Sequence, residues 1–550
     1  MMEVPEQHLS DLVAGHQLGV EPSLLGEIAE VMRERGQLDA RVCGEVYERR
    51  LVTDRTARRA GGAYYTPLHL VDFVVEQTVG SMLDGRGVDE ALTLRIIDPA
   101  CGGGVFLLAV LERIEKHCVD HGHAGGPELR AQIARQCLFG LDIDEAAVDV
   151  CRLALAVRTG EVGNISCADA LADDARAEDG RYDVVLGNPP WGQKGFRFSP
   201  EQKARLRARF ATGRGVLDPF KLFVERAHEL ARPGGRWGMV LPDIILLKNQ
   251  QPVRELVLER STIEWIAHVG RAFAGVNLDA VIIAGRVTPP ADDHRVSIWH
   301  TLPETWRDEP PQTARLEQRV FRELPGAKLN IHLTDESLAM LRALSDLRRF
   351  GDLFECHEGV HTGNARAKLF VDSKLNGDCK PLIVGRSELA RYRLRWAGAW
   401  LDTSAGALDK EAGDYANLGR PEWHDRPKIV VRRTGDRVVA AYDSRGYYCS
   451  NNMFVVLPRR PMSELEMRAH VALLNSALTT WYFRTIQPRV GKLFAELKIQ
   501  HLTDFPLPPT RRWTVGVVRK LVQQDEVDET VFDLFGLDPQ QRAVAVRSCQ

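Results

Sequence analysis

The sequence of 550 residues lacks any apolar run of about 18 residues or more, the length that a membrane-spanning helix needs. Its ten cysteines include no C-x-x-C pair, which favours reduced thiols and argues against a zinc site or a disulfide framework. Residues 1–17 lack the apolar core of a signal peptide, and no internal repeat is present. These absences predict a globular protein of the cytoplasm.

Charge is unevenly distributed along the chain, although the total is only −3. Residues 341–510 hold 26 Lys and Arg against 19 Asp and Glu, whereas residues 1–340 hold 40 against 50. A basic C-terminal half next to an acidic N-terminal half suggests that one part faces phosphate. An excess of this size is also compatible with an ordinary solvated surface, so it supports a nucleic-acid partner without establishing one.

Strand and helix patterns alternate over the first half of the chain, which predicts a parallel, doubly wound sheet. The expected strands are 92–97, 138–141, 182–186, 237–241 and 281–287, and the expected helices between them are 105–114, 146–157 and 220–231. In such a sheet, ligands bind at the carboxyl ends of the strands.

The whole chain is expected to have five parts, because its composition changes several times. They are a helical segment (1–60), an α/β domain (61–290), a proline-rich linker with some strand at 296–299 (291–334), an α+β domain (335–510) and a helical tail (511–550). The α+β assignment depends on short β-branched runs at 427–432, 438–441 and 453–457.

Three motifs fall at expected strand ends. The segment 98–106 (DPACGGGVF) opens a helix with glycines that let the backbone approach a ligand. Asp142 and Asp169 follow the next two strands, where one carboxylate can bind ribose hydroxyls and the other an adenine amino group. Each feature alone is weak, since a glycine turn can be only a turn and an aspartate only a helix cap.

The third motif, 188–191 (NPPW), indicates the chemistry. The exocyclic amine of adenine is a poor nucleophile because its lone pair is delocalised into the ring. The carboxamide oxygen of Asn188 and the main-chain carbonyl of Pro189 can each accept an N–H from that amine and free its lone pair. The prolines keep the carbonyl aimed, and Trp191 offers a flat face to a base that has left its stack.

Together these motifs, with a Tyr-Thr-Pro segment at 65–67, resemble the gamma class of N6-adenine DNA methyltransferases, including the catalytic half of type IIG restriction–modification enzymes. The resemblance covers residues 40 to about 510. It implies a Rossmann-like S-adenosyl-L-methionine-dependent methyltransferase sheet followed by an α+β target-recognition domain that binds double-stranded DNA.

The resemblance also implies residue roles. Thr66 would hold the methionine carboxylate of the cofactor, Asp142 the ribose and Asp169 the adenine, while Phe223 would pack against the cofactor. The full cofactor-binding set is Thr66, Asp98, Ala100, Cys101, Gly102, Asp142, Ile143, Asp169, Asn188 and Phe223. The target adenine would be held by Asn188, Pro189, Pro190, Trp191 and Phe273, although a core role for Phe273 is equally compatible with the sequence.

Two positions depart from the family pattern. Trp191 stands where the family usually has tyrosine or phenylalanine, so the pocket is expected to be reshaped. Ala170 stands where the family often has a larger apolar side chain, which leaves the adenine edge of the cofactor less covered. The implied reaction is a direct displacement that needs alignment and desolvation, and neither a metal nor a covalent intermediate.

The C-terminal domain contributes polar residues that suit base edges and phosphates. The candidates for DNA contact are Thr362, Asn364, Arg386, Arg432, Arg433 and Asn451.

Three other interpretations remain open. The N-P-P-aromatic motif also occurs in methyltransferases that act on RNA or on protein amides. A bifunctional enzyme with a nuclease is disfavoured, since Asp243 has no evident partners for a metal site, but a separate nuclease subunit stays open. A DNA-binding subunit without catalysis is the third, and the intact motif at Asn188 argues against it.

Overall fold

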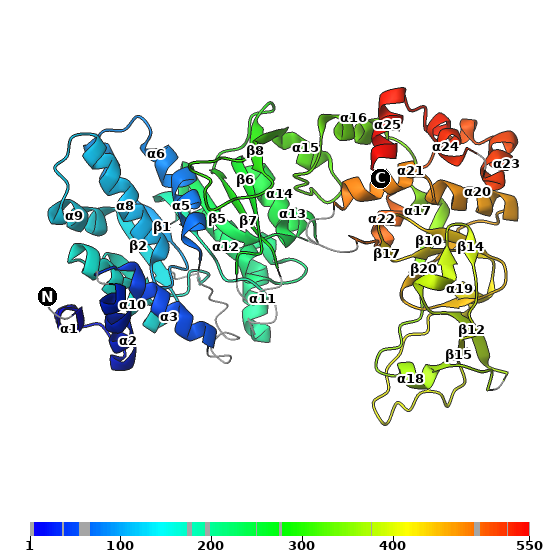
Figure 1. The fold of residues 1–550 in the computed structure, drawn as a ribbon, viewed down its shortest axis with the longest axis horizontal. Helices are drawn as coiled ribbons and strands as arrows, with labels where there is room; N and C mark the ends of the chain where they lie inside the picture. Colours follow the sequence, from blue (N-terminus) through cyan, green and yellow to red (C-terminus); the bar gives the residue numbers. More distant parts are fainter. Residues whose placement is uncertain are drawn as a thin grey trace. The chain divides into compact units, whose positions relative to one another are not determined.

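The computed structural model describes residues 5–35, 38–53, 66–172, 179–192, 198–248, 250–273, 278–375, 377–488, 495–524 and 526–548. The chain divides into two compact units, Met1–Ile331 and His332–Gln550 (Figure 1). Among the helices of the described ranges, none is both long enough and apolar enough to cross a membrane.

The first unit is built on a nine-stranded sheet in the order β3-β2-β1-β4-β5-β7-β6-β8-β9. Its strands are β1 (Ile96–Asp98), β2 (Leu138–Asp142), β3 (Asn164–Cys167), β4 (Tyr182–Gly187), β5 (Ala231–Pro242), β6 (Thr262–Gly270), β7 (Ala280–Arg286), β8 (Arg295–Trp299) and β9 (Ala314–Glu317). Strands β1 to β5 pair in parallel with one another, which confirms the expected doubly wound core.

The sheet is mixed beyond β5, so the expectation of a purely parallel sheet is wrong there. Strand β7 runs antiparallel to both β5 and β6. The sequence pattern did not reveal β6, and only residues 271–279 separate it from β7. A parallel crossover needs about a dozen residues or more. The connection between β6 and β7 is shorter than that, so the two strands form an antiparallel hairpin.

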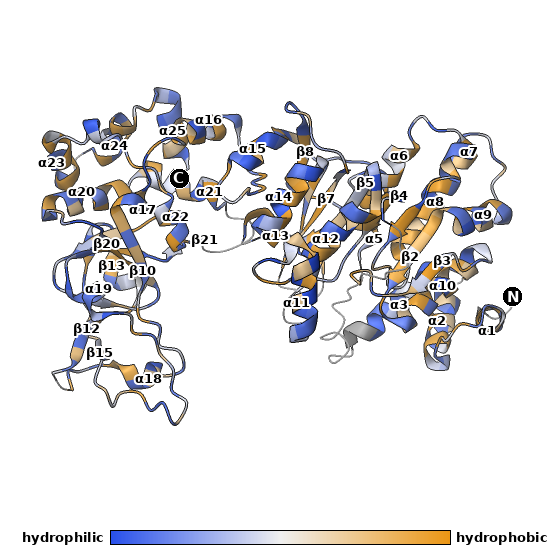
Figure 2. Ribbon diagram, turned by 180° about the vertical axis from the view of Figure 1, so that it is seen from behind, coloured by the Kyte–Doolittle hydropathy of each residue, from blue (hydrophilic) through white to orange (hydrophobic). Residues whose placement is uncertain are grey.

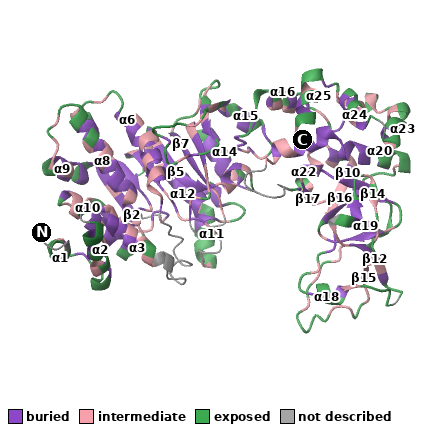
Figure 3. Cartoon of the chain, viewed as in Figure 1, coloured by how far each residue is buried: buried purple, intermediate pink, exposed green. Residues whose placement is uncertain are grey.

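Helices cover the parallel part of the sheet and leave its strands buried (Figure 3). Helices α8 and α10 pack on β2, and α5 and α12 pack on β4 and β5. The helices of this unit are α1 (Pro5–Gly15), α2 (Pro22–Arg35), α3 (Arg41–Thr53), α5 (Leu68–Val75), α6 (Ser81–Leu83), α7 (Val88–Ala91), α8 (Val105–Asp120), α9 (Pro127–Cys137), α10 (Glu145–Thr159), α11 (Pro200–Arg209), α12 (Pro219–Leu230), α13 (Ile244–Leu247), α14 (Gln251–Arg260) and α15 (Gln318–Glu323). Helix α11 is hydrophilic almost throughout, with Leu206 as its buried residue (Figure 2).

The segment 291–334 differs from the expected linker. It carries β8 and β9, which extend the sheet by pairing with β6 and with each other. Apolar residues of this segment, including Val296, Ile298 and Phe321, are buried in the first unit. Its prolines lie between these elements, which explains why composition alone suggested a linker.

The second unit contains an antiparallel sheet in the order β10-β20-β16-β18, which confirms the three strands expected from β-branched runs. These strands are β10 (Phe354–Glu358), β16 (Lys428–Arg432), β18 (Ala440–Asp443) and β20 (Met453–Pro458). A smaller sheet is formed by β11 (Phe370–Val371), β12 (Cys379–Ile383), β15 (Trp400–Asp402) and β19 (Tyr448–Cys449). Two short ribbons pair β13 (Leu389–Ala390) with β14 (Arg393–Leu394), and β17 (Thr434–Gly435) with β21 (Ala495–Glu496).

Helices close the core of the second unit, where Phe350, Phe354, Phe454 and Trp481 are buried together. The helices are α16 (Asp335–Ala343), α17 (Phe350–Leu353), α18 (Arg366–Leu369), α19 (Pro421–Asp425), α20 (Glu464–Leu474), α21 (Ala477–Ile486), α22 (Ile499–Thr503), α23 (Val515–Gln523), α24 (Val527–Phe535) and α25 (Pro539–Arg547). Helices α23 to α25 make up most of residues 511–550.

Candidate functional site

The glycine turn lies between β1 and α8, at the carboxyl edge of the sheet. Asp98 is buried at its start, and its Oδ1 accepts a hydrogen bond from the main-chain N–H of Ala100 at 3.0 Å. Burial raises the pKa of Asp98 to about 8. Gly104 ends the turn with a φ of 87°, and a Cβ there would lie 2.7 Å from Cys151 Sγ. Glycine is therefore required for both conformation and space.

Two further strand ends bring carboxylates to the same edge. Asp142 accepts from the N–H of Gly102 at 2.9 Å and from that of Asp144 at 3.0 Å, so the end of β2 is joined to the glycine turn. The N–H of Cys101 also binds a main-chain carbonyl of β2, that of Leu141, at 2.9 Å. Beside Asp142, Ile143 is 70% exposed, unusual for so apolar a side chain.

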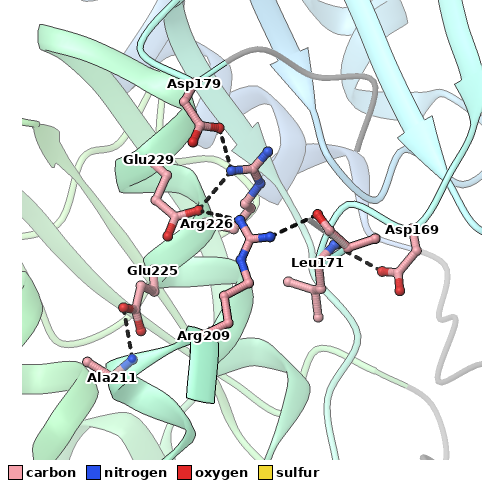
Figure 4. Close-up of polar contacts among 9 residues, drawn as sticks. Asp169, Leu171, Asp179, Arg209, Ala211, Glu225, Arg226 and Glu229 are labelled. Carbon is pink, nitrogen blue, oxygen red and sulfur yellow. Dashed lines mark hydrogen bonds and ion pairs between the residues drawn. The ribbon is translucent and has the colours of Figure 1, made fainter. Parts of the chain in front are cut away.

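Asp169 follows β3, the next strand of the sheet, and its Oδ1 accepts from the N–H of Leu171 at 2.9 Å. Arg209 fixes the end of this segment by donating to the carbonyl of Ala172 and to Glu229 of α12 (Figure 4). Arg226, also on α12, donates to Glu229 as well. The loop with Asp169 is thus attached to the helix that carries Phe223.

The 188–191 motif is connected to the Tyr-Thr-Pro segment by a chain of hydrogen bonds. The carboxamide Nδ2 of Asn188 donates to Thr66 Oγ1 at 3.0 Å, and the indole Nε1 of Trp191 donates to Asn188 Oδ1 at 3.0 Å. Asp218 holds the end of the motif by accepting from the N–H of Gly192 at 3.2 Å. Thr66, which is distant in the sequence, therefore orients the amide nitrogen of Asn188. Trp191, which is close in the sequence, orients its oxygen.

Gly187 allows this motif to approach the glycine turn. Its φ is 151°, and a Cβ at this position would lie only 2.5 Å from Asp98 Oδ1. The end of β4 therefore lies next to the side chain of Asp98, and a residue larger than glycine at position 187 would clash with it.

The two aromatic residues expected at the target base lie together. The rings of Trp191 and Phe273 meet edge to face, with centroids 5.0 Å apart and planes at 84°. Both side chains are buried, as is Phe223. Aromatic pairs favour this edge-to-face geometry. Pro189 is buried and Pro190 half-buried next to them.

Several residues of the site were not found from the sequence. Tyr47 of α3 donates to Asp144 at 2.6 Å, and Glu48 of the same helix lies over the glycine turn. Asp243 lies beside His268 and Asp279, with their donor atoms within 4.8 Å of one another, a group that the sequence pattern did not indicate. The strand that supplies His268 had not been recognised, so the cluster was invisible in the sequence. It contains no lysine and so does not match the nuclease set.

In the second unit, two of the candidate DNA contacts already have strong partners. Arg433 forms ion pairs with Glu496 at 2.9 Å and with Glu358 at 3.3 Å. The amide of Asn364 donates to the carbonyl of Gly413 and accepts from the N–H of Tyr415. These contacts connect loops of the unit, so a structural role competes with DNA contact at both positions.

Three of the other four candidates have side chains that the structure describes. Thr362 is half-buried, and its carbonyl accepts from Ala365. Arg432 lies 4.0 Å from Asp436, and the main chain of Asn451 bonds to Val360. The side chain of Arg386 is outside the described part of the chain.

Comparison with known proteins identifies both units. Residues 39–284 match the N-6 DNA Methylase family, and residues 380–507 match the TaqI-like C-terminal specificity domain. The Type II methyltransferase M.PaeR7I of Pseudomonas aeruginosa is 24% identical over 92% of this chain and 96% of its own. M.XhoI of Xanthomonas vasicola is 29% identical over 88% and 98% respectively.

A solved structure supports the same fold. The Type IIL restriction–modification enzyme MmeI, in complex with DNA, superposes with a TM-score of 0.59 at 13% identity, over 93% of this chain and 81% of that one. Residues 39–284 are therefore similar to N-6 DNA methylases, and the chain is an adenine-specific DNA methyltransferase with a TaqI-like specificity domain that binds DNA.

Proposed function

We propose that the methyl donor is S-adenosyl-L-methionine and that the acceptor is N6 of an adenine flipped out of double-stranded DNA at a specific site. The observation that carries this proposal is the hydrogen-bond chain from Thr66 through Asn188 to Trp191. It joins the residue expected at the methionine carboxylate to the residues expected at the target amine, so donor and acceptor would meet at Asn188.

The residues at the strand ends fit this cofactor. Carboxylates stand at three neighbouring strand ends, where a ribose and an adenine amino group need hydrogen-bond acceptors. The exposed Ile143 offers an apolar surface beside Asp142. Gly187 leaves free the space that a side chain would fill next to Asp98. Thr66, Asp98, Asp142 and Asp169 would hold the cofactor.

When bound, the cofactor supplies an electrophilic methyl group on a sulfonium. The chain's part is to orient the amine and exclude water. Asn188 Oδ1 and the carbonyl of Pro189 would accept from the amine, while Thr66 keeps the carboxamide from rotating. Trp191 and Phe273 would contact the base and offset the few kcal/mol that its unstacking costs, at about 1–3 kcal/mol per stacked base.

The direct test is methyl transfer from labelled S-adenosyl-L-methionine to unmethylated genomic DNA, followed by digestion to nucleosides. Label is expected in N6-methyldeoxyadenosine, and long-read modification sequencing would then give the recognised site. Label confined to RNA or protein would overturn the proposed acceptor, and the absence of any label would point to a binding-only subunit.

A partner nuclease on a separate chain fits the same activity. Full-length relatives are named as Type II methyltransferases, which are modification enzymes. We propose that methylation protects a genome from a nuclease of the same sequence specificity. DNA methylated by this enzyme should resist that nuclease, whereas unmethylated DNA of the same sequence should be cut.

Replacing Trp191 with phenylalanine is expected to lower kcat about fivefold and leave KM for the cofactor unchanged. The change keeps an aromatic ring but removes the indole N–H that orients Asn188, and one such hydrogen bond contributes about 1 kcal/mol. Single-turnover methylation would measure the effect. Trp191→Ala should lose more, because it also removes the stacking surface. An unchanged kcat for the phenylalanine variant would show that the indole does not position Asn188.

Affinity for the cationic cofactor is expected to rise about tenfold or more between pH 6 and pH 8.5. Below about pH 8 the buried Asp98 keeps a proton, and only the ionised carboxylate attracts a cation. The effect of pH on the stability of the free protein has the opposite sign to its effect on cofactor affinity. Its folded state holds a proton that the unfolded chain loses near pH 4, so its stability falls as pH rises from about 4 to 8. Calorimetric titration at several pH values would test this, and Asp98→Asn should reduce the pH dependence, with the pKa of Glu48, also raised to about 8, accounting for what remains.

A further inference from the structure

We infer that Glu48, on the N-terminal helix α3, is a cofactor-binding residue whose carboxylate receives the ammonium group of the methionine part of S-adenosyl-L-methionine. The inference rests on the proposed cofactor. It concerns a residue that neither the sequence motifs nor the strand ends include.

Helix α3 is fixed against the cofactor site at three points. Arg41 at its start forms an ion pair with Glu112 of α8. Gly44 lies directly on the glycine turn, since a Cβ built on Gly103 would be 2.5 Å from Gly44 Cα. Tyr47 donates to Asp144, which caps α10 immediately after β2. The position of the helix, and with it that of the next residue, is therefore set by the site itself.

Glu48 points into the site rather than toward another side chain. Its Oε1 lies 3.6 Å from the position that a Cβ of Gly102 would occupy. Its Oε2 is buried and has no hydrogen-bond partner among the residues that the structure describes. An unpaired buried carboxylate oxygen costs free energy, so a stable protein usually supplies its partner from elsewhere.

The charges around Glu48 indicate the nature of that partner. Burial, Asp142 and Asp98 together raise the pKa of Glu48 to about 8. A cation placed among carboxylates crowded in this way favours their ionised forms. S-adenosyl-L-methionine carries such a cation on the same carbon as the carboxylate expected at Thr66. Gly102, which Glu48 approaches, belongs to the segment expected to face the methionine part.

The remaining polar groups of the cofactor have other acceptors. Asp142 stands at the end of β2, where it is expected to bind the ribose, and Asp169 at the end of β3, where it is expected to bind adenine. Asp98 already accepts a main-chain hydrogen bond. Among these carboxylates, Glu48 has the oxygen that lacks a hydrogen-bond partner within the described ranges, so we assign the ammonium to it.

The experiment compares two ligands in calorimetric titrations of the full chain. S-adenosylhomocysteine contains the ammonium group, whereas 5′-methylthioadenosine contains the ribose and adenine without it. Glu48→Gln is expected to weaken S-adenosylhomocysteine about thirtyfold, as the loss of a charged hydrogen bond would, and to change the affinity for methylthioadenosine less than about twofold. Glu45→Gln is the matched control, since Glu45 lies on the same helix and pairs with Arg35 and Arg49. It should leave both affinities unchanged.

Thermal unfolding without ligand separates this role from a structural one. The melting temperature of Glu48→Gln should equal or exceed that of the wild type, because the change removes repulsion between carboxylates. Unchanged binding of S-adenosylhomocysteine, or equal weakening of both ligands, would overturn the inference, the latter in favour of a ribose contact. If the wild type bound neither ligand, the proposed cofactor itself would be wrong.

Discussion

Replacing Asn188 with alanine is expected to lower the rate of methyl transfer about a hundred- to a thousandfold, the loss typical of one preorganised polar group at a reacting centre. The variant lacks the oxygen expected to accept from the target amine and the amide that bonds to Thr66 and Trp191. Single-turnover methylation of an oligonucleotide with the recognised site would measure the rate. Affinity for DNA should change little, because the second unit is untouched.

The control is another asparagine of the same unit. Asn164 lies at the start of β3, where its amide donates to the carbonyls of Arg135 and Leu138. Asn164→Ala should therefore methylate at close to the wild-type rate. If Asn188→Ala did so as well, the mechanism derived from the 188–191 motif would be wrong.

Replacing Lys428 with methionine is expected to reduce the free energy of unfolding by about 3–5 kcal/mol, because it leaves a buried carboxylate without its cation. Lys428 and Asp443 are both fully buried, and they stand opposite each other where β16 pairs with β18. The same ammonium donates to the carbonyl of His424 at 2.6 Å. Urea unfolding of the full chain, followed through the second unit by loss of DNA binding, would measure the change.

Two further variants make this test specific. Lys410 is exposed, so Lys410→Met should leave the stability within about 0.5 kcal/mol of the wild type. Adding Asp443→Asn to Lys428→Met should recover part of the loss, because the buried group is then neutral. A loss below about 1 kcal/mol for the single variant would show that solvent or another group satisfies Asp443.

The parallel core of the first unit was accessible from sequence because each strand there is a short apolar run followed by a chemical motif. Strands β1, β2 and β4 begin or end within a few residues of the expected positions. The structure then joins motifs that lie far apart in the chain, as Thr66 and Asn188 do. Sequence order suggested that they share one edge, but it contained no information on the hydrogen bond between them.

What the sequence did not reveal depends on contacts between elements of different kinds. Strand β6 lacks the regular alternation of a half-buried strand, and without it neither the antiparallel hairpin nor the neighbourhood of Asp243 and His268 could be foreseen. The position of α3 depends on glycine-to-glycine packing between Gly44 and Gly103. Such packing has no pattern in a single sequence.

Residues that read DNA bases are difficult to predict for a different reason. Arginine and asparagine serve equally well to connect loops and to contact bases, and composition does not separate the two uses. Arg433 illustrates this, since it has two carboxylate partners within the unit. The candidate DNA contacts in the second unit remain predictions. The salt dependence of DNA binding, measured for single variants, would show which of these residues contact phosphates.

If the cofactor binds at Thr66 and the target amine at Asn188, as proposed, the hydrogen bond between these two residues would make the two substrates thermodynamically interdependent. A ligand that fixes the Thr66 hydroxyl also fixes the carboxamide that receives the target amine, so each substrate prepares the site for the other. Thermodynamic linkage is reciprocal. The factor by which bound cofactor raises the affinity for the flipped base must therefore equal the factor by which the bound base raises the affinity for cofactor. Thr66→Val would reduce both factors together, while either substrate alone would still bind.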